Sequence, residues 1–312
     1  MIATPLIIDC DPGIDDAVAI LLALASPELD LRAITTVAGN VPLAHTTANA
    51  LRVLDLAGRA DIPVYAGAEQ ALVHVAANDS AETHGETGLD GSGLPAPSRN
   101  ASSMHAVDAI AGLALAQPGQ ITLAAVGPLT NVALLAAMHP DGFAALKRIV
   151  VMGGSATSGN MSPFAEFNLW FDPEAAARVV ASGQDITLVG LDVTRQAILT
   201  SADIEALAEL PIIGEAVSGM LRYYMRKHVD WYGAEIVYQH DSLAIAHLID
   251  ASILTTAHCH VEVDTSSGPA RGATHVDRLG VFGGAANADW AEAIDVERFR
   301  ALLLGRLARY SI

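Results

Sequence analysis

Short apolar runs alternate with longer amphipathic segments along most of this sequence. The runs are rich in β-branched residues and too short for helices, so each predicts a buried strand. Between them, apolar residues recur three and four positions apart, which predicts helices. Such alternation is typical of an α/β protein with a mostly parallel central sheet flanked by helices. The predicted strands are Leu6–Asp9, Leu31–Val37, Ile62–Tyr65, Ile121–Val126, Arg148–Met152 and Ile186–Leu191, and the predicted helices are Asp16–Ala25, Leu43–Ala57, Met104–Ala116, Leu129–Met138 and Pro173–Ala181.

The last third of the sequence departs from this alternation. Ser201–Asp250 has a helical pattern with many aromatic residues, and Ala288–Arg309 has the pattern of one amphipathic helix. The His258-Cys259-His260 segment resembles a metal-binding sequence, but strand alternation would place Cys259 on the face opposite to both histidines. We therefore expect a strand there and no metal site.

Composition limits the class of protein. Hydrophobic residues make up 52% and charged residues 17% of the chain, which is enough apolar material for a large core. No repeat or low-complexity linker divides residues 1–312, so we expect a single domain. The net charge of −18 would repel nucleic acid and anionic membranes, so we expect neither as a partner. The N-terminal apolar run ends at Asp9 without a basic region and predicts a strand rather than a signal peptide, which makes a cytoplasmic protein the expectation.

An acidic run at the first strand-to-helix junction carries the strongest chemical signal. Asp9, Asp11, Asp15 and Asp16 fall within eight residues, with a Pro-Gly turn in the middle. Ligands of an open parallel sheet bind at the carboxyl ends of its strands, where this run is expected to lie. Several adjacent carboxylates are unfavourable unless a cation neutralises them. Hard oxygen ligands favour Ca²⁺ or Mg²⁺ over zinc.

Two other interpretations of the run compete with a metal site. Asp15 or Asp16 could be an ordinary helix cap, which accounts for one or two of the acids but not for all four. Aspartyl-phosphate phosphatases also begin with Asp-x-Asp after a strand, but their chemistry needs a nearby lysine. Neither lysine of this chain, Lys147 or Lys227, lies just past a predicted strand end. Asp9 is the last residue of the predicted strand Leu6–Asp9 and is expected to support the site rather than to bind the ion.

The acidic motif Asp9–Ala17, with six motifs that follow it, resembles the inosine–uridine nucleoside hydrolase family. The resemblance covers essentially the whole chain, and the motifs occur in the family's order. It implies a Rossmann-like α/β fold, a Ca²⁺-dependent enzyme that cuts a ribonucleoside into ribose and free base, and a homodimer or homotetramer. The six further motifs are Thr36–Asn40, His84–Leu89, Gly127–Asn131, Met152–Gly154, Ala165–Asn168 and His240-Asp241.

The resemblance also implies the metal and ribose ligands. Ca²⁺ would be held by the side chains of Asp11, Asp16 and Asp241 and by the backbone carbonyl of Val126, with Asp11 also the general base on the metal-bound water. Anionic groups around the sugar would stabilise the ribose cation that forms as the N-ribosidic bond breaks. Metal contacts to the 2′- and 3′-hydroxyls would reject deoxyribose, and the lack of an Arg or Lys cluster disfavours phosphorylated substrates. The residues expected to bind ribose are Asp15, Asn40, Met152, Asn160, Glu166 and Asn168.

The leaving base needs its own partners. His240, directly before Asp241, is the expected catalytic acid, and His84 is expected to contact the base. His228 and Tyr232 are four residues apart, so on a helix they share one face that could cover the base, although plain helix packing explains the same spacing.

Family members that prefer different nucleobases differ at a few positions, and these positions indicate which base this chain prefers. Pyrimidine-preferring members tend to carry a tyrosine at the position of Tyr232, but usually a glutamine where this chain has His228. Purine-specific members stack the base on tryptophans, one of them near the position of His84, where this chain has none. We therefore expect uridine and cytidine as favoured substrates, with inosine as a further one.

Two rival functions remain at this point. A hydrolase of a modified ribosyl compound would have the same ribose end and different base-side loops. A nucleoside-binding protein without turnover should lack a base or a metal ligand, whereas every acid that the family pattern requires is present here.

Overall fold

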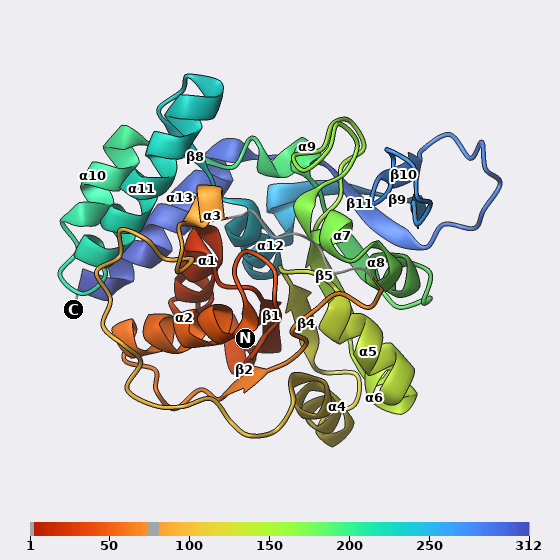
Figure 1. Ribbon diagram of the computed structural model, residues 1–312, viewed down its shortest axis with the longest axis horizontal. Coiled ribbons are helices and arrows are strands. Elements are labelled where there is room, and N and C mark those ends of the chain that lie inside the picture. Colours follow the sequence, from red (N-terminus) through yellow and green to blue (C-terminus); the bar gives the residue numbers. More distant parts are fainter. Residues whose placement is uncertain (1–2, 74–80, 312) are drawn as a thin grey trace.

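The computed structural model describes residues 3–73 and 81–311, without the side chains of Ala81, Glu82 and Tyr232. Its centre is a nine-stranded sheet in the order β10-β9-β11-β6-β5-β4-β1-β2-β3 (Figure 1). Neighbours from β11 to β3 are parallel, and β9 and β10 add an antiparallel edge. The mostly parallel sheet predicted from the sequence is confirmed. The strands are β1 (Thr4–Cys10), β2 (Leu29–Thr36), β3 (Val64–Ala66), β4 (Thr122–Ala125), β5 (Arg148–Met152), β6 (Ile186–Val189), β9 (Leu254–Val263), β10 (Thr274–Asp277) and β11 (Ala288–Ile294).

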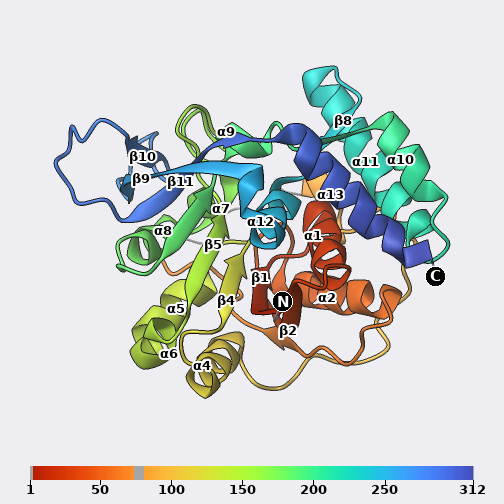
Figure 2. The ribbon, with the colours of Figure 1, turned by 180° about the vertical axis from the view of Figure 1, so that it is seen from behind.

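Helices cover both faces of the sheet, which is why its central strands are continuous apolar runs (Figures 1 and 2). All residues of β4 and β6 are buried. One face packs on α1 (Ile14–Leu24), α2 (Leu43–Leu56), α10 (Ser201–Ala208), α11 (Gly214–Tyr232), α12 (His240–Ile249) and α13 (Val296–Leu307), and the other on α4 (Ala106–Ala116), α5 (Thr130–Met138), α6 (Pro140–Ala144) and α8 (Pro173–Val180). Among the described residues, no helix is both long and apolar enough to cross a membrane.

The single helix predicted over Ala288–Arg309 is wrong in its first half. Ala288–Ile294 is strand β11, which pairs with both β6 and β9, and the helix begins only at Val296. The alanines of this segment fit either structure, and pairing with β6 and β9 decides for the strand, in which Trp290 is completely buried. Asp295 then starts the helix, because its side chain accepts a hydrogen bond from the backbone N–H of Arg298 (3.0 Å).

The continuous helical segment predicted over Ser201–Asp250 is also interrupted. Ile236–Tyr238 is strand β8, which pairs antiparallel with β7 (Ile198–Thr200) in a small second sheet. The short strand lies between α11 and α12 and turns the chain back toward the main sheet. The predicted strand at Cys259 is confirmed within β9, and Cys10 and Cys259 are both free and buried.

Four strands and one helix bring the chemistry-bearing residues together. The chain leaves β1 at Asp11, β2 before Asn40, β4 at Val126 and β5 after Met152, all at one edge of the sheet. α12 begins at this edge as well, and it packs against α1. Two further short helices, α7 (Phe167–Phe171) and α9 (Leu191–Thr194), follow β5 and β6. This edge is where an open parallel sheet binds its ligands.

Candidate active site

A cavity of about 450 Å³ opens at this edge of the sheet. Its walls are formed by segments that are far apart in the sequence. The parallel topology of the sheet brings these segments together. Two predicted site residues are not part of the cavity lining. Asp16 is fully buried beneath it, and the side chain of Tyr232 lies outside the described residues. The predicted site residues that line the cavity are Asp11, Asp15, Asn40, His84, Val126, Met152, Asn160, Glu166, Asn168, His228, His240 and Asp241.

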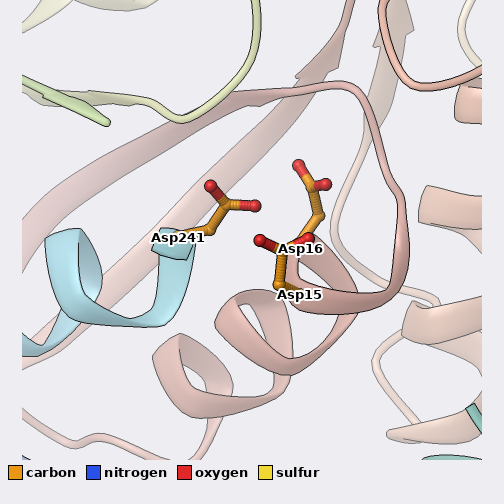
Figure 3. Close-up of side chains that lie close together, drawn as sticks. All are labelled: Asp15, Asp16 and Asp241. Atoms are coloured by element: carbon orange, nitrogen blue, oxygen red, sulfur yellow. The ribbon is translucent and has the colours of Figure 1, made fainter. Parts of the chain in front are cut away.

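Three carboxylates meet at the floor of the cavity. Asp15 and Asp16 stand in the first turn of α1, and Asp241 stands in the first turn of α12 (Figure 3). One oxygen from each lies within 4.8 Å of the others, and all three residues are buried. The helix N-termini favour negative charge at these positions. We call these three residues together with Asp11 the acid cluster.

Asp11 lies beside the three meeting carboxylates and is held there by Asn40. The Asn40 backbone N–H donates to Asp11 Oδ2 (2.6 Å), and its side-chain amide donates to Asp16 Oδ2 (3.2 Å). The Asp11 carboxylate is also enclosed by two glycines. A Cβ at Gly39 would collide with Oδ2, and one at Gly127 would lie 2.6 Å from Oδ1. Asp11 therefore reaches the backbone directly after Val126.

Burial and mutual repulsion perturb the acid cluster. Burial raises the pKa of Asp15 to about 8 and that of Asp16 to about 6. The pKa values of Asp11 and Asp241 are raised well above their ordinary range, first by burial and then by the neighbouring carboxylates. Among the described residues, no ion pair joins an acid of the cluster to an arginine or lysine. Several buried carboxylates without a basic partner have the electrostatics of a cation site.

One atom of the cluster tests whether a metal fits. Asp16 Oδ2 accepts from the backbone N–H of Gly13 (2.9 Å), so this residue does have the helix-capping role considered from the sequence. Its other oxygen, Oδ1, is buried and accepts no hydrogen bond from an N–H or hydroxyl group of the described residues. An orphaned carboxylate oxygen is costly unless a cation contacts it. The acid cluster therefore fits a divalent ion with oxygen ligands.

A polar wall lies beside the acid cluster. Glu166 is buried and accepts hydrogen bonds from the backbone N–H groups of Gly154 (3.0 Å), Asn168 (2.9 Å) and Leu169 (3.2 Å). Burial nevertheless raises its pKa to about 7. The Asn168 side-chain amide donates to the carbonyls of Val126 (2.9 Å) and Met152 (3.0 Å), so its oxygen is the atom left to accept from a ligand. Such a wall suits a ligand with several hydroxyl groups.

Aromatic and imidazole rings form the opposite end of the cavity. The ring centroids of His84 and Tyr224 are 5.5 Å apart, those of Tyr224 and His228 are 4.3 Å apart, and those of His228 and Tyr238 are 4.8 Å apart. The ring centroid of Tyr238 is in turn 5.4 Å from that of His240. This ring chain joins α3 (Ala81–His84), α11, β8 and α12, and its flat faces suit a planar ligand.

The histidines at this end are neutral and oriented. Burial lowers the pKa of His84 to about 3, that of His228 to about 4 and that of His240 to about 3. His84 Nδ1 accepts from the backbone N–H of Ile14 (3.1 Å), so its proton is on Nε2. The Nδ1 of His228 donates to the carbonyl of Ile236 (2.9 Å). His240 Nδ1 is hydrogen-bonded to the hydroxyl of Thr194 (2.7 Å), which fixes its ring.

Sequence reasoning missed several residues of the cavity. Arg195 follows α9 and Tyr238 belongs to β8, and Trp231 near the end of α11 also lines the wall. Arg195 comes one helical turn after the predicted strand Ile186–Leu191, so the strand-end argument could have found it. Tyr238 and Trp231 gave no such signal, because their places depend on how α11 and β8 fold back over the sheet.

Comparisons with known proteins agree with the geometry. The family model described as inosine-uridine preferring nucleoside hydrolase matches residues 6–301. The chain is 44% identical over 98% of its length to a pyrimidine-specific ribonucleoside hydrolase, RihA, from Shewanella sp. (strain MR-4), of which 97% is covered.

Solved structures give the same result for the fold. A plant nucleoside hydrolase, the PpNRh1 enzyme, superposes with a TM-score of 0.94 at 34% identity, over 98% of this chain and 99% of that one. A purine-preferring ribonucleoside hydrolase from Gardnerella vaginalis superposes with a TM-score of 0.92 at 31% identity, with the same coverage. On the family match and these relatives, the chain belongs to the inosine-uridine preferring nucleoside hydrolase family and is an N-glycosidase.

Proposed function

We propose that this chain is a Ca²⁺-dependent ribonucleoside hydrolase of one domain, residues 1–312, that prefers uridine and cytidine and also accepts inosine. The observation that carries the proposal is the division of one cavity into two ends. The acid cluster and a polar wall form one end, which suits a cation and a ribose. Neutral imidazoles and aromatic rings form the other end, which suits a planar base.

The acid cluster and its neighbours would hold the metal. We propose Asp11, Asp16, Asp241 and the carbonyl of Val126 as ligands, and the enclosure of the Asp11 carboxylate against Gly127 supports the inclusion of both Asp11 and Val126. A site with three carboxylates and a carbonyl from the protein favours Ca²⁺ over the more strongly hydrated Mg²⁺. When bound, the ion would supply positive charge that makes a water more acidic and fixes the ribose hydroxyls.

Asp11 would act as the general base. A carboxylate beside a divalent ion is ionised despite its burial, because the ion offsets the repulsion that otherwise raises its pKa. The Asn40 N–H holds one carboxylate oxygen, which leaves the other free to take a proton from the attacking water. This geometry orients the base before substrate arrives, which lowers the entropic part of the barrier.

The polar wall would bind the sugar and stabilise its developing charge. Glu166, Asp15 and the oxygen of Asn168 can accept from ribose hydroxyls, and Asn40, Asn160 and Met152 lie around the same space. Cleavage of an N-glycosidic bond builds positive charge on the ribose ring. Fixed carboxylates near that charge lower the barrier.

His240 and His84 would assist the departing base. A neutral imidazole can donate a hydrogen bond to the negative charge that builds on the base, without first becoming a cation. His84 has its proton on Nε2 and therefore presents a donor. Uracil and cytosine carry carbonyl acceptors, so a donor at this position suits them.

The pyrimidine preference is supported by the relative from Shewanella, which is named pyrimidine-specific. His228 and Tyr232 would cover the base from α11, as their four-residue spacing suggested. The structural neighbour from Gardnerella is named purine-preferring, so the shared fold leaves the base open and the ring end must determine it.

A substrate panel tests the proposal. Purified protein with Ca²⁺ would be assayed for ribose release from uridine, cytidine, inosine and adenosine, and for sugar release from 2′-deoxyuridine. We expect uridine and cytidine to lead and 2′-deoxyuridine to be cleaved at least about 100-fold more slowly, because the missing hydroxyl leaves buried polar groups unpaired. Equal rates for uridine and 2′-deoxyuridine would refute the ribose-binding role, and a lead by inosine or adenosine would refute the pyrimidine preference.

A further inference from the structure

The segment Ala156–Gly159 is held at both ends by residues of one short stretch after β6. Asp192, in α9, accepts a hydrogen bond through Oδ2 from the backbone N–H of Ala156 (2.8 Å). Arg195, one turn later, donates through Nη1 to the Ser158 carbonyl (3.0 Å) and hydroxyl (2.7 Å), and through Nη2 to the Gly159 carbonyl (2.7 Å). A fork of donors on two consecutive carbonyls fixes direction as well as distance.

The residue after this segment is Asn160, at the mouth of the cavity. Its backbone N–H donates to the Ala165 carbonyl (3.1 Å), and its side-chain oxygen accepts from the Phe167 N–H (2.9 Å). The side-chain amino group is therefore the part of Asn160 that can donate to a ligand. The turn is closed so tightly that a Cβ at Gly159 would collide with the backbone of Ala165. A shift of the Gly159 carbonyl must therefore move Asn160 as well.

We propose that Arg195 is a positioning residue, which sets the place of Asn160 at the sugar end of the cavity by holding the carbonyls of Ser158 and Gly159. The consequence for catalysis rests on the proposed function, because it requires Asn160 to bind the ribose. Ser158 is exposed and Asn160 is exposed, so packing alone does not hold this turn. Its order depends on hydrogen bonds, and Arg195 supplies three of them.

Hydrogen exchange tests the structural half of the proposal without any substrate. Five backbone N–H groups of the turn are hydrogen-bonded, including those of Ala156, Gly159 and Asn160. In Arg195→Met, peptides covering residues 155–165 should exchange at least about tenfold faster than in the wild type. Arg306→Met is the matched control, because Arg306 bonds Glu28 outside the cavity (2.7 Å) and should leave these peptides unchanged. Unchanged exchange in Arg195→Met would overturn the proposal.

A double-mutant cycle tests the route through Asn160. Arg195→Met and Asn160→Ala should each lower kcat/KM for uridine by about 10- to 100-fold, the usual result of displacing a substrate-binding group. If Arg195 acts through Asn160, the double variant should be no slower than the slower single variant. Arg195→Lys keeps the charge but not the fork, and should restore part of the activity. Multiplying losses in the double variant would overturn the proposal, since they would mean that the two residues act independently.

The two experiments separate this inference from the proposed function. If the wild type releases ribose from none of the nucleosides, the proposed function fails, and the exchange result still decides whether Arg195 orders the turn. If the wild type is active and Arg195→Met has wild-type exchange and kinetics, only the positioning role fails.

Discussion

The two ends of the cavity are built in different ways. The acid cluster and the polar wall stand at strand ends and in the first turns of α1 and α12, and backbone N–H groups hold Asp11, Asp16 and Glu166 in place. At the ring end, His84 and His228 also bond to backbone atoms of Ile14 and Ile236. In addition, the rings of His84, Tyr224, His228 and Tyr238 contact one another. Groups held by backbone hydrogen bonds keep one geometry, whereas packed rings can be exchanged for others of similar size.

This difference has a functional meaning under the proposed mechanism. Chemistry at the ribose needs charges fixed to within a fraction of an ångström. Selection of the base needs only a flat, partly apolar surface with a few donors. The solved relative named purine-preferring shares the fold with this chain, so the fold alone does not determine the base.

The strongest test of the comparison removes Asp11, the proposed general base. Asp11→Ala should lower kcat for uridine by at least about 1000-fold, because it removes the proposed proton acceptor and one proposed metal ligand together. Initial rates of ribose release with saturating Ca²⁺ would measure the loss. Asp141→Asn, an exposed carboxylate outside the cavity, is the control and should keep full activity. A loss below tenfold in Asp11→Ala would mean that the acid end does not do the chemistry.

The next test distinguishes the roles of the two ends by comparing substrates with different leaving groups. His240→Ala should slow uridine cleavage by about 100-fold, the usual contribution of a group that assists the departing base. A p-nitrophenyl riboside, whose leaving group needs no assistance, should lose less than about fivefold. Parallel assays of both substrates measure the ratio. Equal losses on the two substrates would remove His240 from this role and assign it to the sugar end.

One substitution perturbs both ends at their junction. A Cβ at Gly13 would lie 2.7 Å from His84 Nδ1 and 2.9 Å from Asn40 Nδ2, so one of these side chains must shift. Gly13→Ala should lower kcat/KM for uridine by about tenfold. Gly112→Ala is the matched control, since a Cβ there lies more than 4 Å from the other described residues outside its own helix and should cost no activity. A fully active Gly13→Ala protein would show that neither His84 nor Asn40 needs its observed position.

The smallest expected effect concerns stability rather than rate. Burial raises the pKa of Glu166 to about 7 in the folded chain, whereas an exposed glutamate titrates near about 4.3. The folded state therefore keeps this proton to higher pH. The stabilising contribution is complete below the unfolded value and is lost as the pH rises through the folded value.

Glu166→Gln removes that titration. The free energy of unfolding of the variant, relative to wild type, should rise between pH 5 and pH 7, by at most about 1.4 kcal/mol per pH unit. Urea denaturation of both proteins at several pH values, under identical Ca²⁺ conditions, measures the difference. A difference that does not change with pH would show that Glu166 is ionised in the folded state throughout this range.

The same contrast explains what the sequence could predict. The central strands and the acidic run are local patterns, so a parallel sheet with carboxylates at its edge followed from them. Ala288–Ile294 was missed as a strand because its alanines fit a helix equally well, and only pairing with β6 and β9 decides the structure. Arg195 follows a predicted strand end and could have been found from it, whereas Tyr238 enters the cavity through the long-range folding of β8, which spacing along the chain does not record.

Metal dependence of ribose release is the most direct test of the central claim. Wild-type protein and Asp16→Asn would be assayed on uridine after treatment with a calcium chelator and after addition of Ca²⁺ or Mg²⁺. We predict that chelation stops the wild-type reaction, that Ca²⁺ restores it better than Mg²⁺, and that Asp16→Asn needs far more Ca²⁺ for the same rate. Full activity of the chelated wild type would contradict the account, because the reaction would then not need an ion at the acid cluster.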